Sequence, residues 1–162
     1  MNGPYALTFL GFHLGKDAES GEVTIAISER TRLRMNTRIR ELTPRSWGNS
    51  FDRCVAKVNA YLNGWMGYFQ LCTDRRSFSR FDAHIRRRLR ALRIRQRKRP
   101  RHLFRHLLGR GVSRGMACKA VYVIRGHWKR SASFGVHKAY PNAWFDDRLV
   151  NLYRRWNELN PP

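Results

Sequence analysis

The chain has 162 residues, 42% of them hydrophobic, with five Trp, six Tyr and nine Phe. This apolar content is enough for a core in one domain or two small ones, and it excludes a wholly disordered chain. Lys and Arg total 33 against 11 Asp and Glu, so the formal net charge is +22. Because charge of one sign repels itself in a compact fold, a polyanion such as nucleic acid is the expected partner.

The sequence predicts neither a membrane span nor a secretion signal nor a disulfide framework. No apolar run approaches the ~20 residues that cross a bilayer, and the apolar stretch within residues 1–12 lacks a preceding basic segment. Cys54, Cys72 and Cys118 are widely spaced and odd in number, which is typical of thiols in a reducing compartment. A cytoplasmic protein without membrane association is therefore expected.

The first elements are predicted to be a β-hairpin and a helix. Residues 5–14 are rich in aromatic and aliphatic side chains, and residues 23–27 alternate β-branched with small residues. Ser28 can cap a helix that runs to about Leu42. Pro44 ends this helix, because the residue before a proline disfavours helical geometry.

A series of helices is predicted in the rest of the chain. The clearest begins after Ser50, because apolar residues recur at steps of three and four over residues 51–69. A basic helix is expected to start near Ser79, with Asp82 in a loose capping box, and Pro100 limits its extension. A short helix is expected to end at Gly109, and two further helices are expected at about residues 113–124 and 142–159. The predicted fold class is therefore mainly α with an N-terminal β-hairpin.

Positive charge is concentrated in the second half of the chain. Residues 75–110 hold fifteen Lys or Arg and one acid, and residues 83–145 hold no Asp or Glu. A solvated helix normally mixes both signs, so RNA phosphates are expected to supply the missing partners; the alternative is a solvated basic surface without a partner. The candidate RNA-binding residues are Arg45, Arg75, Arg76, Arg80, Arg86, Arg87, Arg88, Arg90, Arg93, Arg95, Arg97, Lys98, Arg99, Arg110, Arg114, Trp128, Lys129 and Arg130.

Trp128 is included in this set because it lies beside two cations, Lys129 and Arg130. Stacking of an aromatic side chain on an unpaired base contributes ~1–3 kcal/mol. The alternative reading of Trp128 is an anchor in the core, which is the role expected of Trp65.

Three motifs that resemble a catalytic, a metal-binding or a nucleotide-binding site are explained better by a structural role. Asp146 and Asp147 superficially resemble a polymerase carboxylate pair, but neighbours on a helix point about 100° apart, so they are expected to begin the last helix. His102 and His106 have metal-ligand spacing without a third ligand, so solvated or RNA-facing histidines are expected. The glycine-rich residues 109–115 lack a nucleotide-loop signature. No catalytic residue, metal or cofactor is predicted.

Five motifs follow one another along nearly the whole chain. They are Phe-Leu-Gly-Phe at residues 9–12, Ile-Arg-Glu-Leu-Thr-Pro-Arg at 39–45, Gly-Trp-Met-Gly-Tyr-Phe at 64–69, a basic helix at 78–90 and Gly-His-Trp-Lys-Arg-Ser at 126–131. Their order and spacing resemble the end of the palm, the thumb and the maturase-specific domain (domain X) of group II intron-encoded reverse transcriptases.

The resemblance implies a β-hairpin remnant of the palm at residues 1–27, thumb-like helices at 28–73 and a maturase-specific RNA-binding region at 74–162. It implies a fragment that grips structured group II intron RNA and assists splicing or mobility. The catalytic carboxylates of the palm have no counterpart, so no polymerase activity is expected. Two alternatives remain open: half of a split reverse transcriptase that acts in trans, or a vestigial, non-specific nucleic-acid-binding protein. Target DNA and a separately encoded palm-and-fingers chain are the further partners that the resemblance suggests.

Overall fold

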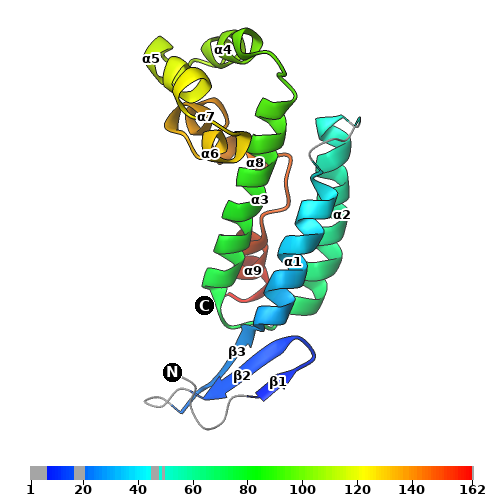
Figure 1. Cartoon of the computed structure of the whole chain (residues 1–162). Coiled ribbons are helices and arrows are strands. Elements are labelled where there is room, and N and C mark those ends of the chain that lie inside the picture. Colours follow the sequence, from blue (N-terminus) through cyan, green and yellow to red (C-terminus); the bar gives the residue numbers. More distant parts are fainter. Residues whose placement is uncertain (1–6, 17–20, 45–47, 49, 162) are drawn as a thin grey trace.

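The computed structural model describes residues 7–16, 21–44, 48 and 50–161. A small sheet lies at one end of the molecule, long helices form its middle, and short helices cluster at the other end (Figure 1). The elements are β1 (Leu7–Phe9), β2 (Phe12–Lys16), β3 (Val23–Ile27), α1 (Glu29–Leu42), α2 (Phe51–Phe69), α3 (Arg75–Arg95), α4 (Pro100–Gly109), α5 (Arg114–Cys118), the π-helical turn η1 (Lys119–Val123), α6 (His127–Ser131), α7 (Phe134–Ala139), α8 (Ala143–Asp146) and α9 (Leu152–Leu159). The prediction of a mainly α fold with N-terminal β structure is confirmed.

The sheet has three antiparallel strands in the order β1-β2-β3, where the sequence predicted two. The run at residues 5–14, whose first two residues lie outside the described part of the chain, is divided by a tight turn. Leu10 and Gly11 have φ values of 48° and 90°, and Phe9 pairs with Phe12 across the turn. Two positive φ values match the twist of a hairpin, but Leu rarely adopts one, so the turn could not be recognised from the residue types.

Gly11 fastens the sheet to α1. Its carbonyl oxygen accepts hydrogen bonds from the Ser28 amide at 3.0 Å and from Thr31 Oγ1 at 2.9 Å. A Cβ atom on Gly11 would lie 2.8 Å from Thr31 Oγ1, so the close approach requires glycine. At the other edge, the Thr73 amide donates to the Ile25 carbonyl at 2.8 Å. The sheet is therefore bonded to the start of α1 and to the connection between α2 and α3.

The two helices that follow confirm the sequence prediction closely. Ser28 caps α1 and Ser50 caps α2, each through its side-chain oxygen. The apolar stripe of α2 is buried along its whole length. Trp65 is 8% exposed, and its ring lies 4.5 Å from Phe69 and 5.3 Å from Phe81, measured between centroids. Its expected packing role is confirmed.

The basic helix α3 begins four residues before the predicted start. Asp74 is its N-cap, since its carboxylate accepts from the Arg76 amide and from Ser77 Oγ. Asp82 does not form a capping box. It is 1% exposed, and its two oxygens accept from the Leu152 and Tyr153 amides at 3.0 and 2.9 Å. Asp82 thus caps α9, which lies beside α3 (Figure 1).

The last third of the chain is more broken than predicted. Pro100 begins α4 instead of only limiting α3, and the predicted helix at residues 113–124 is present as α5 and η1. Residues 127–139 form two short helices that the sequence did not predict. The helix predicted at 142–159 is interrupted between α8 and α9, so Asp146 and Asp147 lie at the end of α8 and not at a helix start.

Candidate nucleic-acid interface

Arg90 lies inside the molecule, contrary to its predicted role in RNA binding. It is 2% exposed. Its Nε donates to the Tyr140 carbonyl at 2.8 Å, and a terminal nitrogen donates to Asn142 Oδ1 at 2.9 Å. Burial, with a smaller contribution from the nearby charge of Arg86, lowers the pKa of Arg90 to about 10. Arg90 fastens α3 to the segment between α7 and α8, and its guanidinium is not available to a phosphate.

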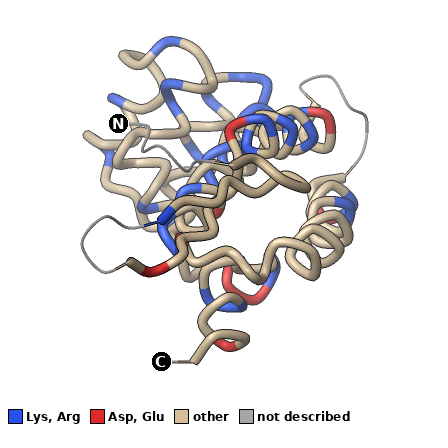
Figure 2. The backbone as a smooth tube through the Cα atoms, turned by 90° about the horizontal axis from the view of Figure 1, so that it is seen from below, with Lys and Arg blue, Asp and Glu red and all other residues tan. Residues whose placement is uncertain are grey.

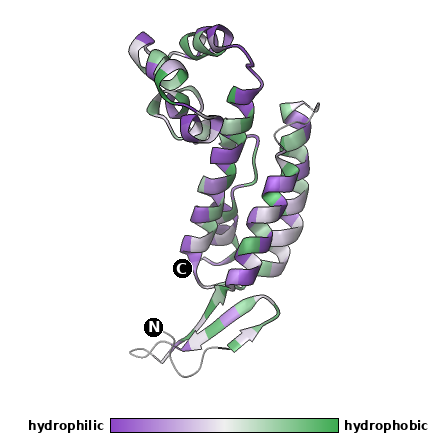
Figure 3. Cartoon of the chain, viewed as in Figure 1, coloured by the Kyte–Doolittle hydropathy of each residue, from purple (hydrophilic) through white to green (hydrophobic). Residues whose placement is uncertain are grey.

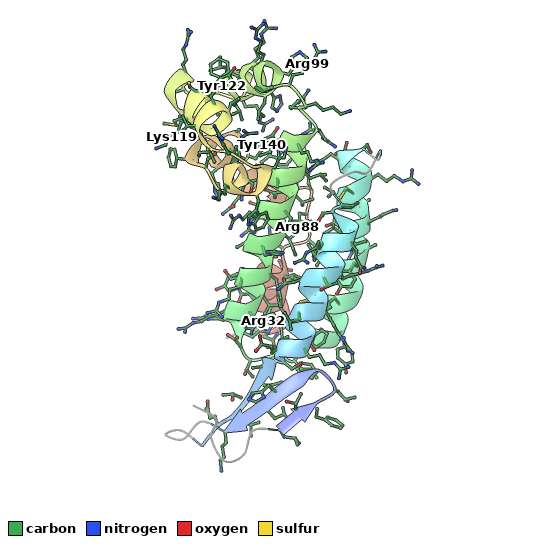
Figure 4. All side chains as sticks on the ribbon, in the orientation of Figure 1. Arg32, Arg88, Arg99, Lys119, Tyr122 and Tyr140 are labelled. Carbon is green, nitrogen blue, oxygen red and sulfur yellow. The ribbon has the colours of Figure 1, made fainter. Side chains whose placement is uncertain are left out.

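Two other predicted arginines are partly buried and bind backbone oxygens of distant elements. Arg88 Nε donates to Thr43 Oγ1 at 2.7 Å, and its Nη2 donates to the Thr43 carbonyl at 3.0 Å. Figure 4 shows Arg88 between α3 and α1, which it joins. Arg110 Nε donates to the Ala139 carbonyl at 2.5 Å. Each of these arginines therefore holds two elements together, whatever else it binds.

Arg130 closes the end of the π-helical turn η1. Its guanidinium donates to the carbonyls of Ala120, Val121 and Ile124 at 2.8, 2.9 and 3.1 Å. A helix end leaves carbonyl groups without intrahelical partners, and a cation beside them is favourable. Burial lowers the pKa of Arg130. The motif at residues 126–131 therefore contributes a C-terminal cap as well as a surface.

Three further arginines of α3 are half-buried, and two of them lie over aromatic rings. The guanidinium carbon of Arg87 is 4.0 Å from the Trp128 ring centroid, and that of Arg93 is 5.2 Å from the Phe51 centroid. Arg86 is half-buried as well. Trp128 itself is 37% exposed, so its ring is packed on one part and open on another. It is neither a fully buried anchor nor a freely exposed ring.

The remaining predicted cations lie at the surface, and all but Arg114 on α5 and Lys129 on α6 belong to two groups. The first comes from the start of α3 and the second from the end of α3 and the connection to α4. Arg99 marks the second group at the outer end of the molecule (Figure 4). The exposed or half-exposed members are Arg75, Arg76, Arg80, Arg95, Arg97, Lys98, Arg99, Arg114 and Lys129; Arg45 lies outside the described residues.

None of these surface cations forms an ion pair within the described part of the chain. In the described part of the chain, the ion pairs are Arg32–Glu29, Arg38–Glu41 and Arg154–Glu158, on α1 and α9. Figure 2 shows the same separation, because the helices α4–α7 carry blue segments and no red ones. A phosphate group that approaches this end of the molecule meets cations whose charge is not cancelled locally.

One surface aromatic side chain was missed by the sequence analysis. Tyr122 on η1 is 53% exposed, and its ring centroid lies 5.9 Å from that of Phe104 on α4. Three exposed cations, Arg101, Arg105 and Lys119, come from the same two elements. Figure 4 shows Tyr122 and Arg99 at the same end of the molecule. The signal in the sequence was the alternation of aromatic and basic residues in both helices, without an intervening acid.

The histidines and paired acids do not form a metal site. Among the described residues, no three His, Cys, Asp or Glu side chains are grouped so that they could hold an ion. His106 is half-buried, where the sequence predicted a solvated or RNA-facing side chain, and its Nε2 is hydrogen-bonded to the Tyr140 hydroxyl. Burial, and then the charges of nearby arginines, lower the pKa of His106 to about 4. His102, Asp146 and Asp147 are exposed.

A cavity of about 290 Å³ lies between the residues that follow α1, the C-terminal part of α3 and the start of α6. Thr43 and Pro44 line it just after α1, and Trp128 lines it from α6. Arg88 and Arg95 contribute guanidinium groups from α3. No helix in the described residues has the length and apolar character needed to cross a bilayer.

The comparison with protein families agrees with this geometry. Residues 32–111 match the family model described as the group II intron, maturase-specific domain. The match begins in α1, includes all of α2, α3 and α4, and ends just after α4. No curated protein matches the chain. The family match, together with the motif at residues 64–69 and the basic helix α3, supports a maturase-specific (domain X) region of a group II intron protein at residues 32–111.

Proposed function

We propose that the chain binds structured group II intron RNA and thereby assists the splicing or mobility of the intron. The family match supports a maturase role in splicing. The observation that carries the RNA-binding step is the group of surface cations around Arg97, Lys98 and Arg99, which form no ion pair within the described residues. Because Arg and Lys at a phosphate release counterions, these residues would supply most of the affinity.

The proposed mechanism divides the arginines into two classes. Those that bind carbonyl groups, such as Arg88, Arg90 and Arg130, hold the helices and turns of the chain against one another. Those at the surface contact phosphates and so position the RNA. Specificity would come from RNA shape and from unpaired bases that reach aromatic side chains such as Tyr122. The chain acts in this proposal as a rigid support for a folded RNA.

We also propose that the chain acts by binding and not by catalysis. Polymerase chemistry needs several carboxylates at one point to hold divalent metal ions. In the described structure, Asp146 and Asp147 stand at the exposed end of α8, and no group of three potential ligands includes them. The catalytic step of splicing would then belong to the RNA.

The test is a salt titration of RNA binding with charge-matched variants of the full chain. One variant carries Arg97→Ala, Lys98→Ala and Arg99→Ala. The control carries Arg32→Ala, Arg38→Ala and Arg154→Ala, which removes the same charge from exposed arginines that pair with acids. We expect the first variant alone to flatten the plot of log affinity against log salt, by about 0.7 for each lost single-strand phosphate contact, or about 2 in total.

Three results would contradict this proposal. Equal loss of slope in both variants would show a diffuse attraction to the whole protein and not a local interface. An unchanged slope in the first variant would remove residues 97–99 from the interface. Equal affinity for intron RNA and for a scrambled RNA of the same length would favour a non-specific nucleic-acid-binding protein.

A second candidate function is that of a fragment that completes a reverse transcriptase in trans. The observation that favours it is the apolar, exposed sheet, which carries green segments in Figure 3. Leu7 and Phe9 on the edge strand β1 are 61% and 59% exposed, and Val23 on β3 is 63% exposed. Edge strands of this kind add strands from other chains. Co-purification of a palm-and-fingers chain that is lost in a Leu7→Lys, Phe9→Lys variant would support this candidate, and recovery of the wild-type protein alone would count against it.

A further inference from the structure

The cavity between α1, α3 and α6 has the dimensions of a small-ligand site. Its volume of about 290 Å³ is close to the lower end of the range of ~300–1,000 Å³ that is usual for ligand pockets. Three segments that are far apart in the sequence form its walls. They contribute Pro44 just after α1, Leu92 on α3 and Trp128 on α6. All three of these walls are apolar or aromatic, so the cavity favours a flat, weakly polar group.

The described polar residues that line the cavity are Thr43, His127, Arg88 and Arg95, and the two arginines are cationic. Arg88 is held by its two hydrogen bonds to Thr43, so its guanidinium needs little further ordering before it meets a ligand. Arg95 is half-exposed at the C-terminal end of α3. No Asp or Glu is among the described residues that line the cavity. An occupant with a negative group at its edge and an uncharged body therefore fits, and a cation does not.

Trp128 keeps part of its ring open toward the cavity. Arg87 lies 4.0 Å from the ring centroid, and the His84 ring lies 5.9 Å away. Neither Arg87 nor His84 lines the cavity, whereas Trp128 does. Trp128 therefore borders the cavity at a place that Arg87 and His84 do not line. An indole with a cation beside it is a favourable surface for stacking a planar base.

We propose that this cavity receives one unpaired nucleobase of the bound RNA, which stacks on Trp128 while its phosphate approaches Arg95. The inference rests on the proposed RNA-binding function and adds a defined site to it. A base has the planar, uncharged body that the walls accept, and it brings the attached phosphate that the arginines require. A base buried in this way would fix the register of the RNA against α3, a role that phosphate contacts alone cannot perform.

The experiment compares two single-stranded oligonucleotides of twelve residues on the full chain. One is oligouridine, and the other has the same backbone with the central bases removed. Fluorescence anisotropy gives the ratio of their affinities. We expect the wild-type protein to bind the complete oligonucleotide about tenfold more tightly, in line with the energy of one base stacked on an aromatic ring. In Trp128→Ala and in Ala91→Phe, which fills the cavity from α3, this ratio should fall to about one.

The control is Phe134→Ala, which removes an aromatic side chain that is 73% exposed on the neighbouring helix α7; its ratio should equal that of the wild type. Melting temperatures confirm that each variant is folded. If the affinity ratio fell to one in Trp128→Ala alone, the base would lie outside the cavity. If it fell to one in Ala91→Phe alone, stacking on Trp128 would be excluded. Each of these results, or an unchanged ratio in both, would overturn the inference. If neither oligonucleotide bound at low salt, the proposed function itself would fail.

Discussion

The replacement of Asp82 by Ala is expected to release the C-terminal helix from the rest of the protein. Asp82 is 1% exposed, and its carboxylate accepts from the amides of Leu152 and Tyr153, at the start of α9. The helix has a local cap as well, since Asn151 Oδ1 accepts from the Arg154 amide at 2.9 Å. Asp82 therefore supplies the tertiary part of the capping, from 70 residues away in sequence.

The magnitude follows from the two amides that would lose their acceptor. An unsatisfied buried N–H group costs about 1–3 kcal/mol. Leu152 is fully buried, but Tyr153 is half-buried and its amide can recover water. Burial raises the pKa of Asp82, which means that removal of the carboxylate also relieves a desolvation cost. We therefore expect a net loss of about 2 kcal/mol, or a decrease of about 4–8 °C in melting temperature for a chain of this size. Asp82→Asn keeps one acceptor and should lose about half as much.

The assay is denaturant unfolding followed by tryptophan fluorescence. Trp156 on α9 reports the docking directly, because its Nε1 donates to the Cys72 carbonyl at 2.7 Å and its ring stacks on Phe78. Asp147→Ala is the control, since Asp147 is exposed at the end of α8. If Asp82→Ala unfolds at the same denaturant concentration as Asp147→Ala, the two amides do not depend on Asp82 and the reasoning is refuted.

Three further predictions concern the core, the π-helical turn and one histidine. Trp65→Ala should cost about 3–5 kcal/mol, and an unaltered melting temperature would show that the ring is not part of the core. Arg130→Lys should lose about 1–2 kcal/mol, because an ammonium group cannot reach three carbonyls as a guanidinium fork does; Lys129→Ala, at an exposed neighbour, should change stability by less than about 0.5 kcal/mol. His106 has a pKa of about 4 in the folded protein against an ordinary value of 6.5. Its contribution to the free energy of unfolding is therefore complete above pH 6.5 and is lost as the pH falls toward 4. Allowing for the partial exposure of His106, we expect acid to lower the free energy of unfolding by about 1–2 kcal/mol. Urea unfolding between pH 7 and 4 measures this loss, which should be absent in His106→Gln. Parallel pH curves for the two proteins would contradict the prediction.

Long, strongly periodic elements could be predicted from the sequence, and short ones could not. The stripe at residues 51–69 repeats over five turns and gave α2 almost to the residue. The helices at His127–Ser131 and Phe134–Ala139 are five and six residues long, too short for any periodicity to show. The turn at Leu10 was hidden because its residue type does not announce a positive φ.

The roles of the arginines were only partly visible in the sequence. A run of basic residues indicates a polyanionic partner, and the surface cations around Arg97 to Arg99 are consistent with that. The partners of Arg88, Arg90 and Arg130 are backbone carbonyls from other elements, which no sequence pattern marks. An arginine that ties helices together and one that awaits a phosphate are therefore identical in the sequence and differ only in what surrounds them.

Several buried or half-buried guanidinium groups donate to carbonyl oxygens, and this has an electrostatic consequence. A carboxylate would neutralise the cation it holds, whereas a carbonyl is a dipole without net charge. Arg90, Arg110 and Arg130 are thus held in fixed positions while each still contributes a full positive charge to the long-range field. The same side chains that give the helical cluster its shape also draw distant anions toward it.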